Sequence, residues 1–309
     1  MIRRALLTIP LLLASGTLAA EDADPPPPSP ATPDPAALEL ASVNAAIADL
    51  ESGRVLYRKN ADRVVPIASI TKVMTALVVL ESGADLEEWL TVVEREHAAP
   101  NNAYTRLRRG SQARRGDLLR IALMSSENHA AYVLARHHPG GLSAFVEAMN
   151  DKARALGMER TRFVDPSGLS ARNRSTADDL LKLVTAATAN ATIRRFTDTP
   201  RHTVQFRYPR YRLRYGNTNV LAYRRRWDLD LSKTGYLDEA GRCLVMVTDI
   251  EGRQVAMVLL DSFGRRTPVG DAGRIRRWLE TGEGGSIAAA ARRYEQRRSE
   301  QMASADPAD

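Results

Sequence analysis

The sequence has 309 residues, of which 44% are apolar and 26% are charged. This composition is ordinary for a soluble globular protein, and it excludes a wholly disordered chain and a polytopic membrane protein. The length allows one large domain or two smaller ones with a substantial core. The net charge is +7, and the single cysteine, Cys243, excludes an internal disulfide and a cysteine-cluster metal site.

The first 20 residues have the features of a secretory signal peptide. Two arginines precede a short apolar stretch, and small residues follow it up to Ala20. The apolar stretch is shorter than the roughly 20 residues that span a bilayer, so we expect cleavage and no integral membrane anchor. Residues 21–37 are rich in proline, which predicts an extended linker. We therefore expect the folded domain to cover residues 38–282.

The first half of that domain predicts a hairpin followed by helices. Apolar and polar side chains alternate over residues 42–57 around a Glu51-Ser52-Gly53 turn, which favours two paired strands. From Ser69 onward, apolar residues recur at the spacing of a helix that is buried nearly all round. Helical periodicity, together with residues that favour the beginning or end of a helix, predicts further helices over residues 116–124, over residues 142–156 and from Ser175 to about Ala189.

The C-terminal third is rich in predicted strands. Cys243–Thr248 and Val255–Leu260 are apolar runs joined by a glycine-containing turn, which indicates two central antiparallel strands. A last helix is expected around Trp278, and residues 283–309 form a polar, Arg-rich tail that we expect to fray. The order of strands, helices, strands and helix predicts an α+β fold: an antiparallel β-sheet flanked by helices, with an inserted helical subdomain.

Ser69 and Lys72 form a Ser-x-x-Lys pair, one helical turn apart on the same face. A serine hydroxyl needs a base to take its proton, and a lysine buried among apolar residues has its pKa lowered enough to act as one. The chain has only five lysines against 39 arginines, and arginine cannot lose its proton. A Ser-x-x-Lys pair can also occur by chance. Without a catalytic role, Ser69 would be a helix-capping serine and Lys72 a surface lysine.

A second set, Ser126-Glu127-Asn128, follows the helix that is predicted to end near Met124. From a tight turn, Ser126 could relay a proton and Asn128 could orient a substrate amide. The structural alternative is an N-cap for the next helix.

A third set, Lys233-Thr234-Gly235, lies next to the predicted C-terminal strands. Glycine lets another backbone approach closely, and lysine and threonine supply donors for a carboxylate. The structural alternative for this tripeptide is a β-turn.

The three sets occur in the order Ser-x-x-Lys, Ser-Asp-Asn and Lys-Thr-Gly of the penicilloyl-serine enzymes, with Glu127 in place of the aspartate. On these sets the chain resembles the low-molecular-mass penicillin-binding proteins, which are D-alanyl-D-alanine peptidases of the bacterial periplasm. The resemblance covers about residues 40–282 and includes Asp165-Pro166-Ser167-Gly168-Leu169-Ser170. Asn217-Thr218-Asn219 and residues 240–245 are similar to the endopeptidases of the penicillin-binding-protein-seven type.

The resemblance implies a β-lactamase/transpeptidase-like fold and a periplasmic serine D,D-peptidase that hydrolyses D-alanyl bonds in peptidoglycan peptide stems. It implies no cofactor, and it implies that β-lactam antibiotics are covalent inhibitors. In this resemblance Ser69 would attack the carbonyl carbon of a D-alanyl residue and Lys72 would accept the Ser69 proton. Ser126 would pass a proton to the leaving amine.

The same resemblance implies the substrate-binding residues. Asn128 would hold the substrate amide, and Lys233 and Thr234 would bind a substrate carboxylate. Gly235 and Tyr236 would continue the strand along which substrate lies, and the backbone amides of Ser69 and Tyr236 would form the oxyanion hole.

Two related activities are alternatives. A β-lactamase also needs a carboxylate that activates the deacylating water, and neither Glu159 nor Asp165 lies in a Glu-x-x-x-Asn pattern.

A D-alanyl-D-alanine carboxypeptidase is the closer alternative. Many proteins with these motifs carry a further C-terminal β-domain and an amphipathic anchoring helix, whereas residues 287–302 have no large apolar face. This favours an endopeptidase that cuts the cross-link between two stems.

Non-catalytic functions are also open at this stage. The arginine runs at residues 108–109, 114–115 and 224–226 could suggest nucleic-acid binding, but an exported protein favours solvated faces or attraction to the anionic wall. An inactive wall-binding scaffold is a further alternative.

No His-Glu-x-x-His motif is present, so no metal is expected. His129 either borders the cleft or packs in the core, and Cys243 is expected to be buried and inert.

Overall fold

The computed structural model describes residues 33–96, 103–224 and 226–304. The predicted signal peptide and the predicted linker up to residue 32 lie outside the described residues. The described chain begins with the 3-10 helix η1 (Pro35–Ala37), in which the Asp34 side chain accepts a hydrogen bond from the Ala36 amide.

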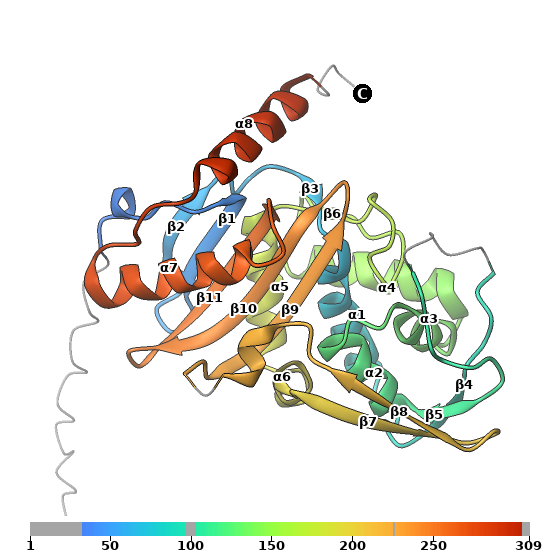
Figure 1. Ribbon diagram of the computed structural model, residues 1–309. Helices are drawn as coiled ribbons and strands as arrows, with labels where there is room; N and C mark the ends of the chain where they lie inside the picture. The colour runs from blue at the N-terminus through green and yellow to red at the C-terminus, as the bar shows by residue number, and fades with distance from the viewer. Residues whose placement is uncertain (1–32, 97–102, 225, 305–309) are drawn as a thin grey trace, which may run out of the picture. The chain divides into compact units, whose positions relative to one another are not determined.

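A five-stranded antiparallel sheet joins the N-terminal and C-terminal segments of the described chain (Figure 1). Its strand order is β2-β1-β11-β10-β9, so the predicted N-terminal hairpin is confirmed and lies beside the predicted C-terminal strands. The β1–β11 register runs from Ser42 opposite Ser262 to Asp49 opposite Val255. The strands are β1 (Ser42–Asp49), β2 (Val55–Lys59), β9 (Leu229–Leu237), β10 (Gly241–Ile250) and β11 (Arg253–Ser262).

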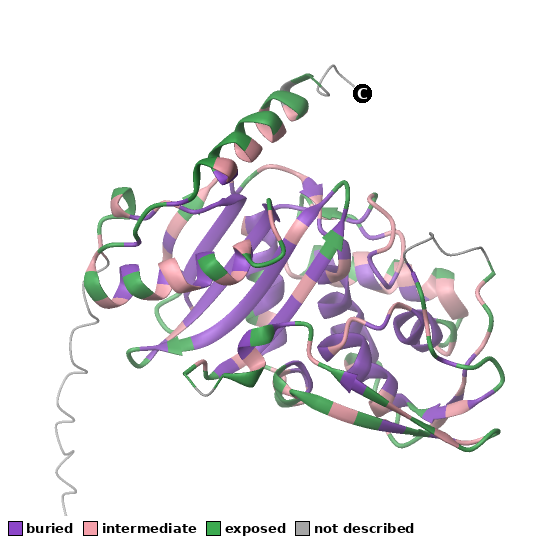
Figure 2. Ribbon diagram, in the orientation of Figure 1, coloured by how far each residue is buried: buried purple, intermediate pink, exposed green. Residues whose placement is uncertain are grey.

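The middle strands are buried on both faces, which explains their unbroken apolar runs (Figure 2). Helix α7 (Thr267–Thr281) covers one face of the sheet and α5 (Ala177–Thr188) packs on the other. Successive side chains of β11 alternate between the two cores. Those on the α7 side are Val255, Met257 and Leu259, and those on the opposite side are Ala256, Val258 and Leu260.

A helical subdomain surrounds α1 (Thr71–Glu81), whose residues are buried from Thr71 to Val79 as the sequence predicts. The helix begins two residues later than expected, because Ser69 lies in the preceding 3-10 helix η2 (Ala68–Ile70). No helix in the described ranges is both long and apolar enough to cross a membrane. The remaining elements between β2 and β9 are β3 (Val65–Pro66), β4 (Trp89–Thr91), β5 (Gln112–Arg114), α2 (Arg115–Met124), α3 (Asn128–Arg136), α4 (Gly141–Ala155), β6 (Arg174–Ser175), α6 (Ala191–Asp198), β7 (Arg201–Phe206), β8 (Tyr211–Gly216) and η3 (Val220–Tyr223).

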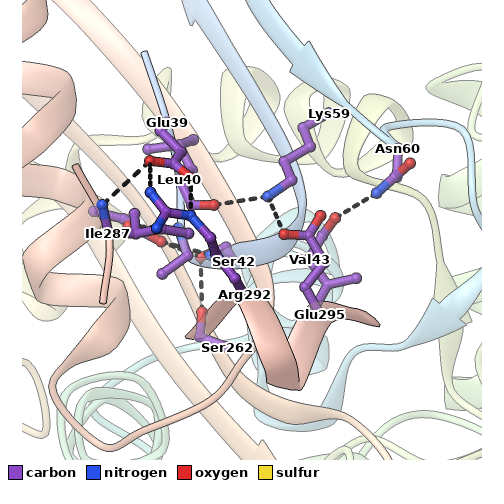
Figure 3. A network of polar contacts seen from close by, with 12 residues as sticks. Glu39, Leu40, Ser42, Val43, Lys59, Asn60, Ser262, Ile287, Arg292 and Glu295 are labelled. Carbon is purple, nitrogen blue, oxygen red and sulfur yellow. Dashed lines mark hydrogen bonds and ion pairs between the residues drawn. The ribbon is translucent and has the colours of Figure 1, made fainter. Parts of the chain in front are cut away.

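The expectation of a fraying C-terminal tail is wrong for helix α8 (Ala289–Ser304). Its residues are mostly good helix formers and include no glycine or proline, so the segment favours a helix. Arg292 forms two parallel hydrogen bonds of 2.7 Å with the Glu39 carboxylate, and Lys59 forms an ion pair of 2.9 Å with Glu295 (Figure 3). Asp261 at the end of β11 accepts hydrogen bonds from Tyr294 and Arg298 of α8. These partners come from distant parts of the chain, so only the folded structure brings them to the helix.

Candidate active site

Edge strand β9 lies directly against η2, and Gly235 permits this contact. A Cβ atom added at Gly235 would lie 3.2 Å from each of Ser69 N, Ile67 O and Ala68 Cβ. The glycine that the sequence analysis associates with a close backbone approach is therefore found at one. As a result, Ser69 lies beside the Lys233-Thr234-Gly235 segment.

The loop of residues 165–170 also lies against η2, and Asp165 organises this loop. The Asp165 carboxylate accepts hydrogen bonds from the amides of Ser167, Gly168 and Ser170 at 2.7 to 3.0 Å. It also accepts one from the Ser167 hydroxyl at 2.6 Å and one from the Asn173 side chain at 3.0 Å. Because these donors occupy both of its oxygens, the Asp165 carboxylate acts as a loop organiser.

Gly168 has a positive φ of 80°, and a Cβ atom added there would lie 2.0 Å from the Ala68 carbonyl oxygen. A side chain of any kind would therefore force η2 or the loop to move. The close contact explains how the loop holds the segment that carries Ser69.

Lys72 is completely buried and lies at the centre of the site. Its Nζ is 2.8 Å from Ser69 Oγ and 2.7 Å from Asn128 Oδ1, and it donates to the Ser167 carbonyl oxygen. Burial lowers the pKa of Lys72 to about 7, although the negative charges of Asp165 and Glu127 oppose this effect. A substantial fraction of Lys72 is therefore a neutral amine near neutral pH.

The partners of Lys72 fix the direction of its lone pair in the neutral state. A neutral amine has two N–H donors and one lone pair. The Ser167 carbonyl and the Asn128 amide oxygen can only accept, so they take both N–H groups. The lone pair then faces Ser69 Oγ, the only one of the three partners with a proton to donate. This arrangement can remove a proton from Ser69.

Ser126 and Lys233 form a second donor–acceptor pair beside Ser69. Ser126 has a positive φ of 59°, which is uncommon for a residue other than glycine, and it accepts a hydrogen bond of 2.9 Å from Lys233 Nζ. Lys233 is fully buried, and burial together with the positive charge of Lys72 lowers its pKa well below the usual lysine value. Two amines and two hydroxyls thus adjoin one cleft.

Glu127, the one departure from the Ser-Asp-Asn pattern, turns away from this group of residues. Its carboxylate caps α3 by accepting a hydrogen bond from the Ala130 amide. Burial raises the pKa of Glu127, with the hydrogen bond from Thr105 acting in the opposite direction. The helix-cap role that was the alternative for this tripeptide therefore falls to its middle residue, and Ser126 and Asn128 are left to face the cleft.

Six of the eight predicted site residues line one cleft of about 1170 Å³, whereas the buried Lys72 and Lys233 reach it through their contacts with Ser69 and Ser126. Ser69, Ser126, Asn128, Thr234 and Tyr236 are among the residues that line it. At its β9 wall, the hydroxyls of Thr234 and Thr218 are hydrogen-bonded at 2.6 Å. No carboxylate side chain is among the described residues that line the cleft.

His129, for which the sequence left two alternatives, and Cys243, which was expected to be buried, both have structural roles. His129 is buried, its Nε2 is 2.8 Å from the Val93 carbonyl oxygen, and Arg95 donates to its Nδ1, so it packs in the core. Burial raises the pKa of the Cys243 thiol to about 12, which makes it a poor nucleophile at neutral pH. Within the described ranges, no group of three or more His, Cys, Asp and Glu side chains could hold a metal ion.

The structure adds residues to which the sequence analysis gave no role. Ser167 contacts Lys72 through its carbonyl oxygen, which carries no signal in the residue type. Thr218 joins the wall of the cleft and Asp165 holds the loop. Both belong to segments quoted for the family resemblance, which is the only signal that could have indicated them.

Comparison with known proteins shows the family of the chain. The sequence profile of the family described as D-alanyl-D-alanine carboxypeptidase matches residues 30–264. The chain is 47% identical over 304 residues to the D-alanyl-D-alanine endopeptidase of Pseudomonas aeruginosa, covering 98% of this chain and 97% of that protein. It is 46% identical over 267 residues to the D-alanyl-D-alanine endopeptidase of Escherichia coli, covering 86% of each.

A solved structure supports the same assignment. Penicillin-binding protein D2 from Listeria monocytogenes, in its ampicillin-bound form, matches with a TM-score of 0.67 and 31% sequence identity. The match covers 79% of this chain and 98% of that one, and it confirms the predicted fold class. The family profile spans most of the sequence, and the relatives extend over nearly all of it. The chain therefore belongs to the D-alanyl-D-alanine carboxypeptidase family of serine D-Ala-D-Ala peptidases.

Proposed function

We propose that the protein is a D-alanyl-D-alanine endopeptidase that cleaves peptidoglycan cross-links through an acyl-enzyme on Ser69. Ser69 attacks the carbonyl carbon of the D-alanyl residue, and Lys72 takes the Ser69 proton. The observation that carries this proposal is the buried Lys72 amine, which lies 2.8 Å from Ser69 Oγ and has a pKa of about 7. The endopeptidase names of the two relatives support the choice of reaction.

The remaining roles follow from the positions of polar groups around Ser69. Ser126, which receives a hydrogen bond from Lys233, passes a proton to the leaving amine. The backbone amides of Ser69 and Tyr236 stabilise the oxyanion, and the close approach of β9 to Ser69 N at Gly235 supports this role. Asn128 holds the substrate amide.

The carboxylate next to the cleaved bond binds at Lys233 and Thr234. Thr234 exposes its hydroxyl to the cleft beside Thr218, and Lys233 supplies a buried amine. An arriving carboxylate favours the protonated form of Lys233 and so offsets the effect of burial on its pKa.

The same acyl-enzyme chemistry makes β-lactam antibiotics covalent inhibitors. We expect the penicilloyl adduct on Ser69 to be long-lived, because no carboxylate lines the described cleft and Asp165 is occupied by its loop. This separates the proposed activity from that of a β-lactamase. In this proposal the protein is exported by its N-terminal signal and acts on the cell wall in the periplasm.

The direct test is mass spectrometry of cross-linked muropeptide dimers after incubation with wild type and with Ser69→Ala. We expect the wild type alone to convert dimers to monomers. Loss of a terminal D-alanine with the dimers intact would instead establish a carboxypeptidase. If neither product forms and penicillin leaves no adduct on Ser69, the catalytic proposal is wrong and a wall-binding scaffold takes its place.

The pKa of Lys72 gives a further expectation for the pH dependence of acylation. Below about pH 7 the amine is protonated and has no lone pair for the Ser69 proton, so the rate should fall about tenfold per pH unit below pH 6. Above pH 7 the rate should level off. Stopped-flow acylation by a fluorescent penicillin from pH 5 to pH 9 measures this profile. A flat profile over that range contradicts the assignment of Lys72 as the base.

A further inference from the structure

The β7–β8 hairpin, which lies outside the cleft, carries positive charge with no negative charge beside it in the sequence. Residues 199–227, which include the hairpin, contain no aspartate and no glutamate. Within the described ranges, none of the five arginines of the hairpin forms an ion pair. Arginines that lie close together repel one another, and a bound anion relieves this repulsion. The five are Arg201, Arg207, Arg210, Arg212 and Arg214.

The strand register places three of these arginines on one exposed face of the hairpin. Arg214 lies opposite Thr203, and Thr203 shares its face with Arg201, which is two residues earlier on β7. Arg212 lies opposite Gln205, so it joins the same face. All of these side chains are exposed, and successive positions on this face are roughly 7 Å apart along each strand. The opposite face packs in the core through Val204, Phe206, Tyr211, Leu213 and Tyr215.

Contacts with neighbouring segments hold the hairpin and two of its arginines in place. The backbones of Arg207 and Gln112 exchange hydrogen bonds of 2.8 and 3.0 Å, which join β7 to β5. Arg207 Nε also donates to Gln112 Oε1, and its guanidinium carbon is 4.1 Å from the centre of the Trp89 ring. The guanidinium carbon of Arg201 is 5.2 Å from the centre of the Tyr223 ring. A guanidinium that is already held in this way loses little freedom when a ligand binds.

The hairpin leads away from the cleft without being part of it. Its last residue, Gly216, is followed directly by Asn217 and Thr218, which line the cleft, whereas none of the five arginines does. From this end the six residues of β8 extend over roughly 20 Å. Figure 1 shows the hairpin along the edge of the helical subdomain, with its far end beside β5. A polymer that is held in the cleft can therefore continue along the hairpin.

We infer that the exposed face of the β7–β8 hairpin binds carboxylates of peptidoglycan stem peptides that neighbour the one in the cleft, and so anchors the enzyme to the polymer. This inference rests on the proposed function, because it takes peptidoglycan as the substrate. Stem peptides that are not cross-linked end in a carboxylate, so negative groups recur along the polymer as the arginines do along the hairpin. A polymer that is bound at two places keeps its other stem peptides at a high local concentration near Ser69.

The side chains of this face favour an acidic polymer over a lipid surface. The outward-facing positions of β7 and β8 carry arginine, threonine, glutamine and glycine, and none of them is a large apolar residue. Binding in the plane of a bilayer depends on apolar side chains that enter the boundary between headgroups and acyl chains. Thr203 and Gln205 can instead form hydrogen bonds with the polar groups of a glycan or a peptide.

The test is co-sedimentation with purified peptidoglycan sacculi, with every protein in the Ser69→Ala background so that the sacculi are not cut. One batch of sacculi keeps its carboxylates, and in the other carbodiimide and ammonia have converted them to amides. Adding Arg212→Gln and Arg214→Gln should weaken binding to native sacculi about fivefold, because two exposed charge contacts are lost. On amidated sacculi the proteins with and without these two substitutions should bind equally weakly.

Arg293→Gln together with Arg297→Gln is the matched control. Both arginines are exposed on α8, form no ion pair within the described ranges and remove the same charge when they are replaced. This control should bind native sacculi as tightly as Ser69→Ala alone, and circular dichroism checks that each variant is folded. An equal loss in the control shows a general attraction of a basic protein to anions and overturns the inference, as does unchanged binding by the hairpin variant.

A second measurement tests the lipid alternative with vesicles of equimolar phosphatidylethanolamine and phosphatidylglycerol. If the hairpin substitutions weaken binding to these vesicles and leave binding to sacculi unchanged, the face binds a membrane surface and the inference is wrong. The proposed function fails separately, if wild type cuts no cross-links and forms no adduct with penicillin while the charge-dependent binding to sacculi remains.

Discussion

Lys72→Met should acylate with penicillin about 10² to 10⁴ times more slowly than wild type, a loss typical of a removed general base. Methionine is close in length to lysine and can fill the same buried space, but it has no lone pair basic enough to accept the Ser69 proton. The Ser69 hydroxyl would keep its position in η2 and remain a weak nucleophile. The measurement is the second-order rate of adduct formation on Ser69, followed by intact-protein mass spectrometry.

Lys72→Arg separates the role of a base from that of a positive charge. Arginine keeps the charge but cannot lose its proton, so we expect it to acylate as slowly as the methionine variant. Circular dichroism and the thermal midpoint check that each variant is folded. Acylation at the wild-type rate by a folded Lys72→Arg protein would show that Lys72 acts through its charge.

Gly168→Ala should lower the acylation rate at least 100-fold, although residue 168 has no chemical role. A Cβ atom there would lie 2.0 Å from the Ala68 carbonyl oxygen, so either η2 with Ser69 or the loop whose Ser167 carbonyl contacts Lys72 must move. A displacement of about 1 Å in a reacting group can by itself cost about 100-fold in rate. The clash and the positive φ together should lower the free energy of unfolding by about 2 to 4 kcal/mol, measured by urea denaturation.

Gly252→Ala is the matched control for this substitution. Gly252 has a similar φ of 75°, but no atom lies within 4 Å of its added Cβ, so only the backbone strain of about 1 kcal/mol remains. Its acylation rate should equal that of wild type. If Gly168→Ala also acylates normally, the contact between the 165–170 loop and η2 does not position Ser69.

Local sequence patterns were sufficient for most of the secondary structure. The alternation over residues 42–57 predicts the β1–β2 hairpin, and the helical spacing after Ser69 predicts a buried α1. These predictions hold because each element buries its apolar side chains at its own period. The helix in the polar C-terminal tail was harder to predict. Helix α8 has no apolar stripe, and Glu39, Lys59 and Asp261 from distant parts of the chain hold it in place.

The spacing of Ser-x-x-Lys, Ser-x-Asn and Lys-Thr-Gly identified by itself the side chains that face the cleft. Side-chain types carry that information, because serine, lysine and asparagine supply the hydroxyl, amine and amide groups of the site. The tertiary structure alone determined how the groups act together. The low pKa of Lys72 needs its complete burial, its lone pair is directed by the Ser167 carbonyl, and the β9–β10 register places the buried Lys233 opposite Val245. Burial, backbone acceptors and strand register depend on residues far apart in sequence, so they exist only once the chain has folded.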